Sequence, residues 1–530
     1  MKNFFFIAIA ALALISCKES VEYPGWNSPL EGEDEVYHDM IVLGEQLQDP
    51  YSVDNMTKAL QTVHPAAAGR VALEATDFYV RFLPKNEDQL NTLVNLGLEL
   101  VDHPLDYRIV REGDWYHDPE IPEDSITWLY TVVPVDFEFP RDIRYERLDD
   151  CYLADHDVST KADGIDWEAV EREAFRLTGN ESELLPMTKD EEDSGPQSPS
   201  GRIAFLDPDH SEEPEGVKGV KVVCNSFVKF AICYTDEDGN YRMTKSFSSR
   251  PRYRLVFQNI KGFSQGINFL IVPASVSTFG RQSASGYSVT LDRFSERKLL
   301  IRCVMNNVGY DYMDLSRKTS GQIPTPPSSL RIWDIELFNL ELSTMMHHGV
   351  VVETMPMLVE MPTPYKMLIE TIQTDMLIGF DGLETVADIY CKGLHMLAHA
   401  GHFAKTGKDW WWSYVQFSVR SLAYTFFSSI YGAESDADSN YTEIAETFAF
   451  HCQNVLARRR YGEEWPLAGT DSWFSPQLLM YLDDRGLGLE EVAPIFTEDV
   501  TQMSELHDKL LSYYPSFKTI INEAFTRYNK

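Results

Sequence analysis

The chain has few cysteines for its length, seven among 530 residues, and no two of them show a C-x-x-C spacing. That scarcity excludes a small disulfide-bonded scaffold. Six cysteines lie well inside the chain, and we predict that they are mostly buried free thiols without a disulfide: Cys151, Cys224, Cys233, Cys303, Cys391 and Cys452.

Basic residues are also scarce, with 46 lysines and arginines against 82 aspartates and glutamates, for a formal net charge of −36. The acidic residues are spread along the chain and do not form a tail. Because nucleic-acid binding needs a basic surface to meet the phosphates, this charge balance argues against a nucleic-acid partner.

The apolar run at the N-terminus, Phe4 to Ile15, is shorter than the roughly 20 residues that a membrane-spanning helix needs. Together with Lys2 it predicts a secretory signal peptide over residues 1–16, followed by Cys17. An ordinary cleaved signal with an incidental cysteine is the alternative.

The "LISC" sequence that ends at Cys17 resembles the bacterial lipobox, and the following "KES" resembles in part the export signal of Bacteroidetes surface lipoproteins, with Ser20 interrupting the acidic pair. The resemblance implies that Cys17 carries the lipid. It also implies an outer-membrane lipoprotein, held at the cell surface through that anchor.

Composition shifts divide the remaining 514 residues into several domains. Residues 17–185 predict a small α+β domain: "DFYVRFLP" and the segment after it predict strand, short helix and strand, and "DWEAVEREAFRLTGN" predicts a helix that stops at Gly179. Residues 186–201 are acidic and rich in Ser, Pro and Gly, which is typical of a linker.

Residues 202–275 alternate apolar and polar side chains and predict a β-sandwich. Asp238-Gly239 stands between two β-rich runs and predicts a hairpin. Calcium binding at "DEDGN" is disfavoured because Lys245 stands where an EF-hand has glutamate. The segment resembles the carboxypeptidase-regulatory, transthyretin-like domain.

Residues 276–530 contain the candidate chemistry. "ADIYCKGLHMLAHAGHFAKTG" predicts a helix that ends before Gly407 and places His395 and His399 one turn apart, so that both imidazoles can reach one metal ion. His402 lies on the same stripe. The run "TDMLIGF" before this helix predicts a strand at the edge of a sheet.

A later predicted helix, "NYTEIAETFAFHCQNVLARRRYG", places Glu443, Glu446 and Phe450 on one face. A carboxylate from such a helix could supply the third ligand of a tetrahedral site. The simpler interpretation is a solvated face for the glutamates and interior packing for the histidines. "WWW" at 410–412 is likewise more typical of core packing than of a sugar-binding platform.

"HMLAHAGHF", "AETFA" and the following "YG" resemble a family of Bacteroidetes surface lipoproteins with a gluzincin-like zinc metallopeptidase domain. The resemblance implies a mainly helical zincin-like domain over 276–530, with zinc held by His395, His399 and Glu446. His402 matches a histidine of the family that has no assigned role.

This sequence departs from the family at Met396, which stands where the general-base glutamate belongs. A thioether cannot transfer protons, and that help is worth roughly 10² to 10⁴ in rate. We therefore expect a domain that has lost peptidase activity and serves as a binding or scaffold module, with a protein or peptide as ligand. The alternative is an active zinc hydrolase with a displaced base, for which Glu443 is the candidate.

Overall fold

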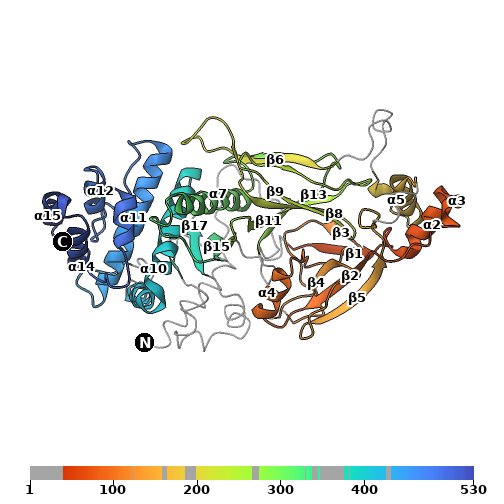
Figure 1. The fold of residues 1–530 in the computed structure, drawn as a ribbon, viewed down its shortest axis with the longest axis horizontal. Helices are drawn as coiled ribbons and strands as arrows, with labels where there is room; N and C mark the ends of the chain where they lie inside the picture. Colours follow the sequence, from red (N-terminus) through yellow and green to blue (C-terminus); the bar gives the residue numbers. More distant parts are fainter. Residues whose placement is uncertain are drawn as a thin grey trace, which may run out of the picture.

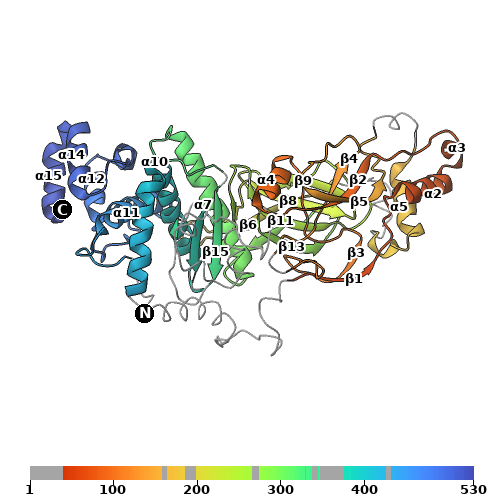
Figure 2. The same cartoon turned by 90° about the horizontal axis from the view of Figure 1, so that it is seen from below.

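The computed structural model describes residues 40–122, 125–157, 164–184, 198–265, 274–328, 330–336, 344–345, 375–380, 382–424 and 431–530. The elements form an elongated molecule, with sheets and helices of the N-terminal region at one end, β-strands in the middle and a helical region at the C-terminal end (Figures 1 and 2). This confirms a mixed α+β fold with a C-terminal helical region. Cys17 and the signal peptide lie outside the described residues.

In the N-terminal region a three-stranded antiparallel sheet has the order β4-β2-β5, and β1 pairs with β3 beside it. Val80 and Phe82 point to one face of β2 and pack under α4, whereas Tyr79 belongs to a second core on the other face. The elements are β1 (Val42–Gln46), α2 (Val53–Val63), α3 (Pro65–Ala68), β2 (Asp77–Leu83), α4 (Glu87–Asn95), β3 (Tyr107–Arg111), β4 (Leu129–Pro134), β5 (Arg144–Cys151) and α5 (Trp167–Leu177).

The sequence predictions for this region hold in part. The predicted strand and short helix are β2 and α4, but the strand predicted directly after α4 is only a single bridge between Val101 and Tyr130 before β3 starts. The predicted helix α5 ends as expected, since Gly179 follows it with a φ of 74°.

Two sheets pack together in the middle of the molecule. The smaller contains β6 (Ser200–Phe205), β7 (Glu215–Gly216), β10 (Asn240–Arg242) and β14 (Val289–Leu291). The larger has the order β16-β17-β15-β12-β11-β8-β9, and β13 also pairs with β11. Its strands are β8 (Val220–Ser226), β9 (Lys229–Tyr234), β11 (Arg252–Asn259), β12 (Ser264–Gln265), β13 (Val276–Arg281), β15 (Arg331–Glu336), β16 (Thr344–Met345) and β17 (Met376–Phe380). Ile203 and Phe205 from the smaller sheet share a core with Val222 and Leu255 from the larger.

One prediction about the middle region is wrong, and two observations concern the bounds predicted for it. Asp238-Gly239 does form a turn, but β10 after it pairs with β6 instead of folding back on β9, so the predicted hairpin is wrong. The larger sheet continues across the predicted boundary between 275 and 276, because β12 pairs in parallel with β15. Residues 186–197 of the predicted linker lie outside the described residues, and Ser200 already begins β6.

The strand predicted from "TDMLIGF" is confirmed as β17, but it does not lie at the edge. It pairs in parallel with β15 over five residue pairs and antiparallel with β16 on its other side. β17 comes before the long helix α10 (Val386–Tyr424) in the sequence, and the two lie near each other in the molecule (Figure 1).

Helices α7 (Arg297–Lys318), α10 and α11 (Ser439–Tyr461) pack around the C-terminal part of this core, with α12 (Gln477–Asp483), α13 (Leu489–Val492), α14 (Met503–Tyr513) and α15 (Lys518–Arg527) beyond them. Gly401 on α10 allows a close approach, since a Cβ there would lie 2.6 Å from the carbonyl oxygen of Pro324. Among the described residues no helix is long and apolar enough to cross a membrane.

A charge network around the buried Asp207 joins the end of α11 to the smaller sheet. Arg460 lies 2.9 Å from Asp207 and 2.5 Å from Glu215, and the Tyr461 hydroxyl donates to Asp207 at 3.0 Å. Lys218 contacts Glu215 at 2.8 Å. Because removing one member of such a network leaves a buried charge without its partner, these contacts fix α11 against the β-strands.

Candidate metal centre

The first turn of α10 is held by a reciprocal cap. The Thr385 hydroxyl accepts a hydrogen bond from the backbone N–H of Asp388 at 3.2 Å, while the Asp388 carboxylate accepts from the backbone N–H of Thr385 at 2.9 Å. From this start the helix runs past the histidines to Gly407, whose φ of 79° breaks it. The predicted stop at Gly407 is therefore correct for the first segment, but a second helical segment follows directly.

Helices α10 and α11 bring three predicted ligands together. The Nε2 atoms of His395 and His399 lie 3.0 Å apart, and the Glu446 carboxylate lies 3.2 Å from His395 Nε2 and 3.4 Å from His399 Nε2. Ligand bonds of about 2.0 to 2.1 Å in a tetrahedral zinc site place neighbouring ligand atoms roughly 3.3 Å apart. The three observed separations are close to that spacing, so this buried cluster could bind a metal ion.

The cluster is almost closed to solvent. His399 is 2% exposed and Glu446 1%, whereas His395 retains 8%. Burial lowers the pKa of the His399 imidazole. Burial acts to raise the pKa of the Glu446 carboxyl, but the imidazoles of His399 and His395 outweigh it and hold that pKa well below its usual range. A carboxylate beside a neutral imidazole has the protonation states in which both groups bind metal.

Hydrogen bonds alone leave one poor contact in the cluster, whichever tautomers the two neutral imidazoles adopt. If both carry a proton on Nε2 and donate to Glu446, the two N–H groups face each other at 3.0 Å. If only one does, the bare nitrogen of the other faces the carboxylate as a second acceptor. A cation at the centre would satisfy all three acceptors together, which is the observation by which the residues fit a metal.

Tyr414 is the main residue of the site that the sequence did not predict. Its hydroxyl donates to Glu446 Oε1 at 2.7 Å, and its ring centroid lies 5.6 Å from that of His399. Burial raises the pKa of Tyr414 well above its ordinary value, so the hydroxyl keeps its proton and remains a donor. The continuation of the helix after Gly407 was the only feature of the sequence that could have indicated that Tyr414 lies near the histidines.

Aromatic rings enclose the remaining sides of the histidines. Phe450 lies 4.4 Å from His395 between ring centroids, and Trp411 lies 5.6 Å from His399. Trp410 and Trp411 are buried, which confirms core packing for them.

The Nδ1 atoms of His395 and His399 have no hydrogen-bond partner among the described residues, a departure from most metal sites, where that nitrogen donates to a carbonyl or carboxylate.

None of the other predicted residues belongs to the cluster. Glu443 pairs at 2.5 Å with Lys530, the last residue of the sequence. Met396 is 1% exposed and belongs to the hydrophobic core. His402 is buried among Trp410, Phe448 and Phe496, and burial lowers its pKa well below the ordinary value. Among the described residues no fourth His, Cys, Asp or Glu joins the group.

The predicted free thiols are confirmed for the six cysteines in the described residues, five of them buried and Cys233 partly buried.

Comparisons with models of protein families, with curated proteins and with solved structures find no match. The inference that the buried cluster could bind a metal ion therefore rests on the residues and distances given above.

Proposed function

We propose that this chain is a lipid-anchored outer-membrane lipoprotein whose C-terminal region holds zinc in a peptidase-like scaffold that no longer catalyses hydrolysis. The scaffold serves as a binding module for a protein or peptide. One observation carries this proposal: His395, His399 and Glu446 have the separations of zinc ligands, while Met396 occupies the position of the proton-transferring group.

Zinc supplies a Lewis acid when it is bound, and hydrolysis would also need a base within reach of the attacking water. The residues near the cluster do not offer one. Tyr414 is a protonated donor that already bonds Glu446, and Met396 is a thioether. The near-complete burial of His399 and Glu446 also leaves little access for a peptide bond.

An active hydrolase with a displaced base is the second candidate, and one observation favours it. Catalytic zinc sites have three protein ligands and an open position, whereas structural sites generally have four ligands. The described cluster has three. Glu443, the predicted substitute base, is a poor fit because its carboxylate is ion-paired with Lys530.

The test uses the purified chain made soluble by Cys17→Ser, which should no longer fractionate with membranes. We expect about one zinc per chain by metal analysis, and no zinc-dependent hydrolysis of a general peptide substrate. Chelator-sensitive proteolysis by this protein would overturn the loss of catalysis. Zinc content that does not fall in His399→Ala would overturn the metal site.

A matched pair of variants at position 396 tests the missing base directly. Met396→Glu should raise zinc-dependent hydrolysis by roughly 10² or more, because it restores a carboxylate to the general-base position. Met396→Gln has nearly the same shape without the base, so it should remain inactive. Equal activity in both variants would show that proton transfer is not what the site lacks.

A further inference from the structure

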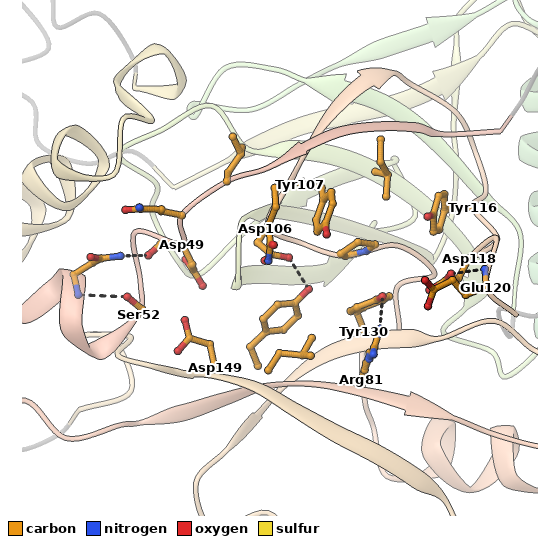
Figure 3. A pocket seen from close by; sticks show the side chains of 18 of the residues that line it. Asp49, Ser52, Arg81, Asp106, Tyr107, Tyr116, Asp118, Glu120, Tyr130 and Asp149 are labelled. Atoms are coloured by element: carbon orange, nitrogen blue, oxygen red, sulfur yellow. Dashed lines mark hydrogen bonds between the residues drawn. The ribbon is translucent and has the colours of Figure 1, made fainter.

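The N-terminal region contains a cleft that the metal cluster does not use. It has a volume of about 740 Å³, within the range of roughly 300 to 1,000 Å³ typical of small-molecule sites. Residues from the segment around β1, from β2 and β4, and from the loops on either side of β3 line it (Figure 3).

Carboxylates gather at both ends of this cleft. Asp49 and Asp149 lie at one end in Figure 3, and Asp118 and Glu120 at the other, with Asp106 between them. Within the described part of the chain, none of the five forms an ion pair. The lining contains one cation, Arg81, and its guanidinium is already bonded to Glu146 at 2.5 and 2.9 Å.

Asp49 is a buried carboxylate without a counter-ion. It is 8% exposed, and its partners are the backbone N–H of Tyr51 at 2.9 Å and the thiol of Cys151 at 3.9 Å. Burial, together with the charges of Asp149 and Asp106, raises the pKa of Asp49 to about 8. The Asp49 carboxyl therefore keeps its proton at neutral pH when no cation is beside it, and a cation placed among these groups would stabilise its ionised form.

Tyrosine rings form the walls between the two acidic ends. Tyr79 and Tyr130 lie with their ring centroids 6.2 Å apart, and Tyr107 and Tyr116 also line the cleft. The Tyr79 hydroxyl donates to Asp106 at 3.2 Å. Aromatic walls favour both alkyl chains and organic cations, since the face of a ring attracts positive charge.

The spacing of the acidic groups separates an organic cation from a metal ion. Within the described residues, the only set of three or more ligand groups close enough for one ion is His395, His399 and Glu446. No three carboxylates of the cleft are therefore close enough together to bind one ion. Two separate acidic ends joined by aromatic walls instead match an extended molecule with a positive charge at each end.

We propose that this cleft binds an alkyl chain that bears primary ammonium groups, with one ammonium at Asp49 and Asp149 and another at Asp118 and Glu120. Such a group occurs in a free polyamine and in the lysine side chains of a peptide. The site is independent of the proposed zinc function, so either can fail without the other.

Calorimetric titration of the Cys17→Ser protein tests the proposal with 1,6-hexanediamine, spermidine and a blocked trilysine peptide. The neutral 1,6-hexanediol and the single-charged hexylamine serve as ligand controls. We expect the diamine to bind at least tenfold more tightly than hexylamine, with no measurable binding of the diol. Tighter binding of spermidine than of trilysine assigns the site to free polyamines, and the reverse order assigns it to peptides.

Two variants address the two ends of the cleft. Asp49→Asn keeps an acceptor for the Tyr51 N–H and should weaken every amine at least tenfold. Glu120→Gln changes an exposed residue and should weaken the diamine severalfold but leave hexylamine unchanged. Asp136→Asn, an exposed acidic residue outside the lining, is the matched control and should have no effect. No amine binding at millimolar concentration, or binding unaffected by both cleft variants, would overturn the proposal.

Discussion

Tyr414→Phe tests whether the buried cluster is organised for a metal. The substitution removes only the hydroxyl that donates to Glu446 Oε1 at 2.7 Å and leaves the ring beside His399 in place. All three ligands remain. The variant therefore separates the orientation of the carboxylate from its presence.

The expected size of the effect follows from this contact. A hydrogen bond to a charged group contributes about 1.5 to 3 kcal/mol, and loss of an outer partner of a metal ligand lowers affinity about 10- to 100-fold. At about 1.4 kcal/mol for each factor of ten, that loss equals roughly 1.4 to 2.8 kcal/mol of zinc binding. Because Glu446 is 1% exposed, water cannot readily replace the lost donor.

Competition with a chromophoric zinc chelator would measure the dissociation constant for the wild type and for Tyr414→Phe. Tyr461→Phe is the matched control, since it also removes a tyrosine hydroxyl that donates to a buried carboxylate, here Asp207 at 3.0 Å. We expect the zinc dissociation constant to rise at least tenfold in Tyr414→Phe and to stay unchanged in Tyr461→Phe. Equal zinc affinities in all three proteins would refute the role of Tyr414 in orienting Glu446 for a metal.

Three further substitutions test the fold. The pKa of Asp49 is raised to about 8 from an ordinary 3.8, so the folded state keeps this proton over a pH range in which the unfolded state has lost it. The stability that the protonated group contributes is fully present below pH 3.8 and is lost as pH rises through 8. Asp49→Asn should therefore gain stability relative to the wild type over this range, as measured by urea unfolding at pH 4 and pH 9. Arg460→Met leaves the buried Asp207 carboxylate without its cation, while Glu215 keeps Lys218, and should lower the unfolding free energy by about 3 kcal/mol in the same assay. In an exposed helix a glycine-to-alanine substitution is stabilising, but in Gly401→Ala the new Cβ would meet the Pro324 carbonyl, so calorimetry should show destabilisation of about 1 to 3 kcal/mol. A raised melting temperature would contradict this close approach.

The cluster of His395, His399 and Glu446 was predictable because most of its signal is local. His395 and His399 are one helical turn apart, and this spacing fixes their relation once the helix forms. Glu446 was predicted as the third member from its position on one face of a second helix and from the resemblance to a family. The direct contact between the two helices, with separations of 3.2 and 3.4 Å, was a prediction that the structure confirms.

Features that depend on long-range pairing were predicted less well. The turn at Asp238-Gly239 is a local property, and it forms, but the partner of the next strand is β6 from an earlier part of the chain. The same reason explains why β17 has neighbours on both sides and why one sheet crosses the expected domain boundary at 275. Turn chemistry limits the local path of the backbone, whereas strand order depends on which apolar faces meet.

The sequence alone determined the acidic character of the chain, the helix that carries the histidines, its interruption at Gly407 and the absence of a carboxylate at position 396. These follow from residue identity and from interactions within a few residues. Tertiary packing decided that Tyr414 bonds Glu446, that Glu443 pairs with Lys530 and that a tyrosine-walled acidic cleft forms in the N-terminal region. Each of these joins side chains from elements separated along the chain, so they depend on how the elements fold against one another.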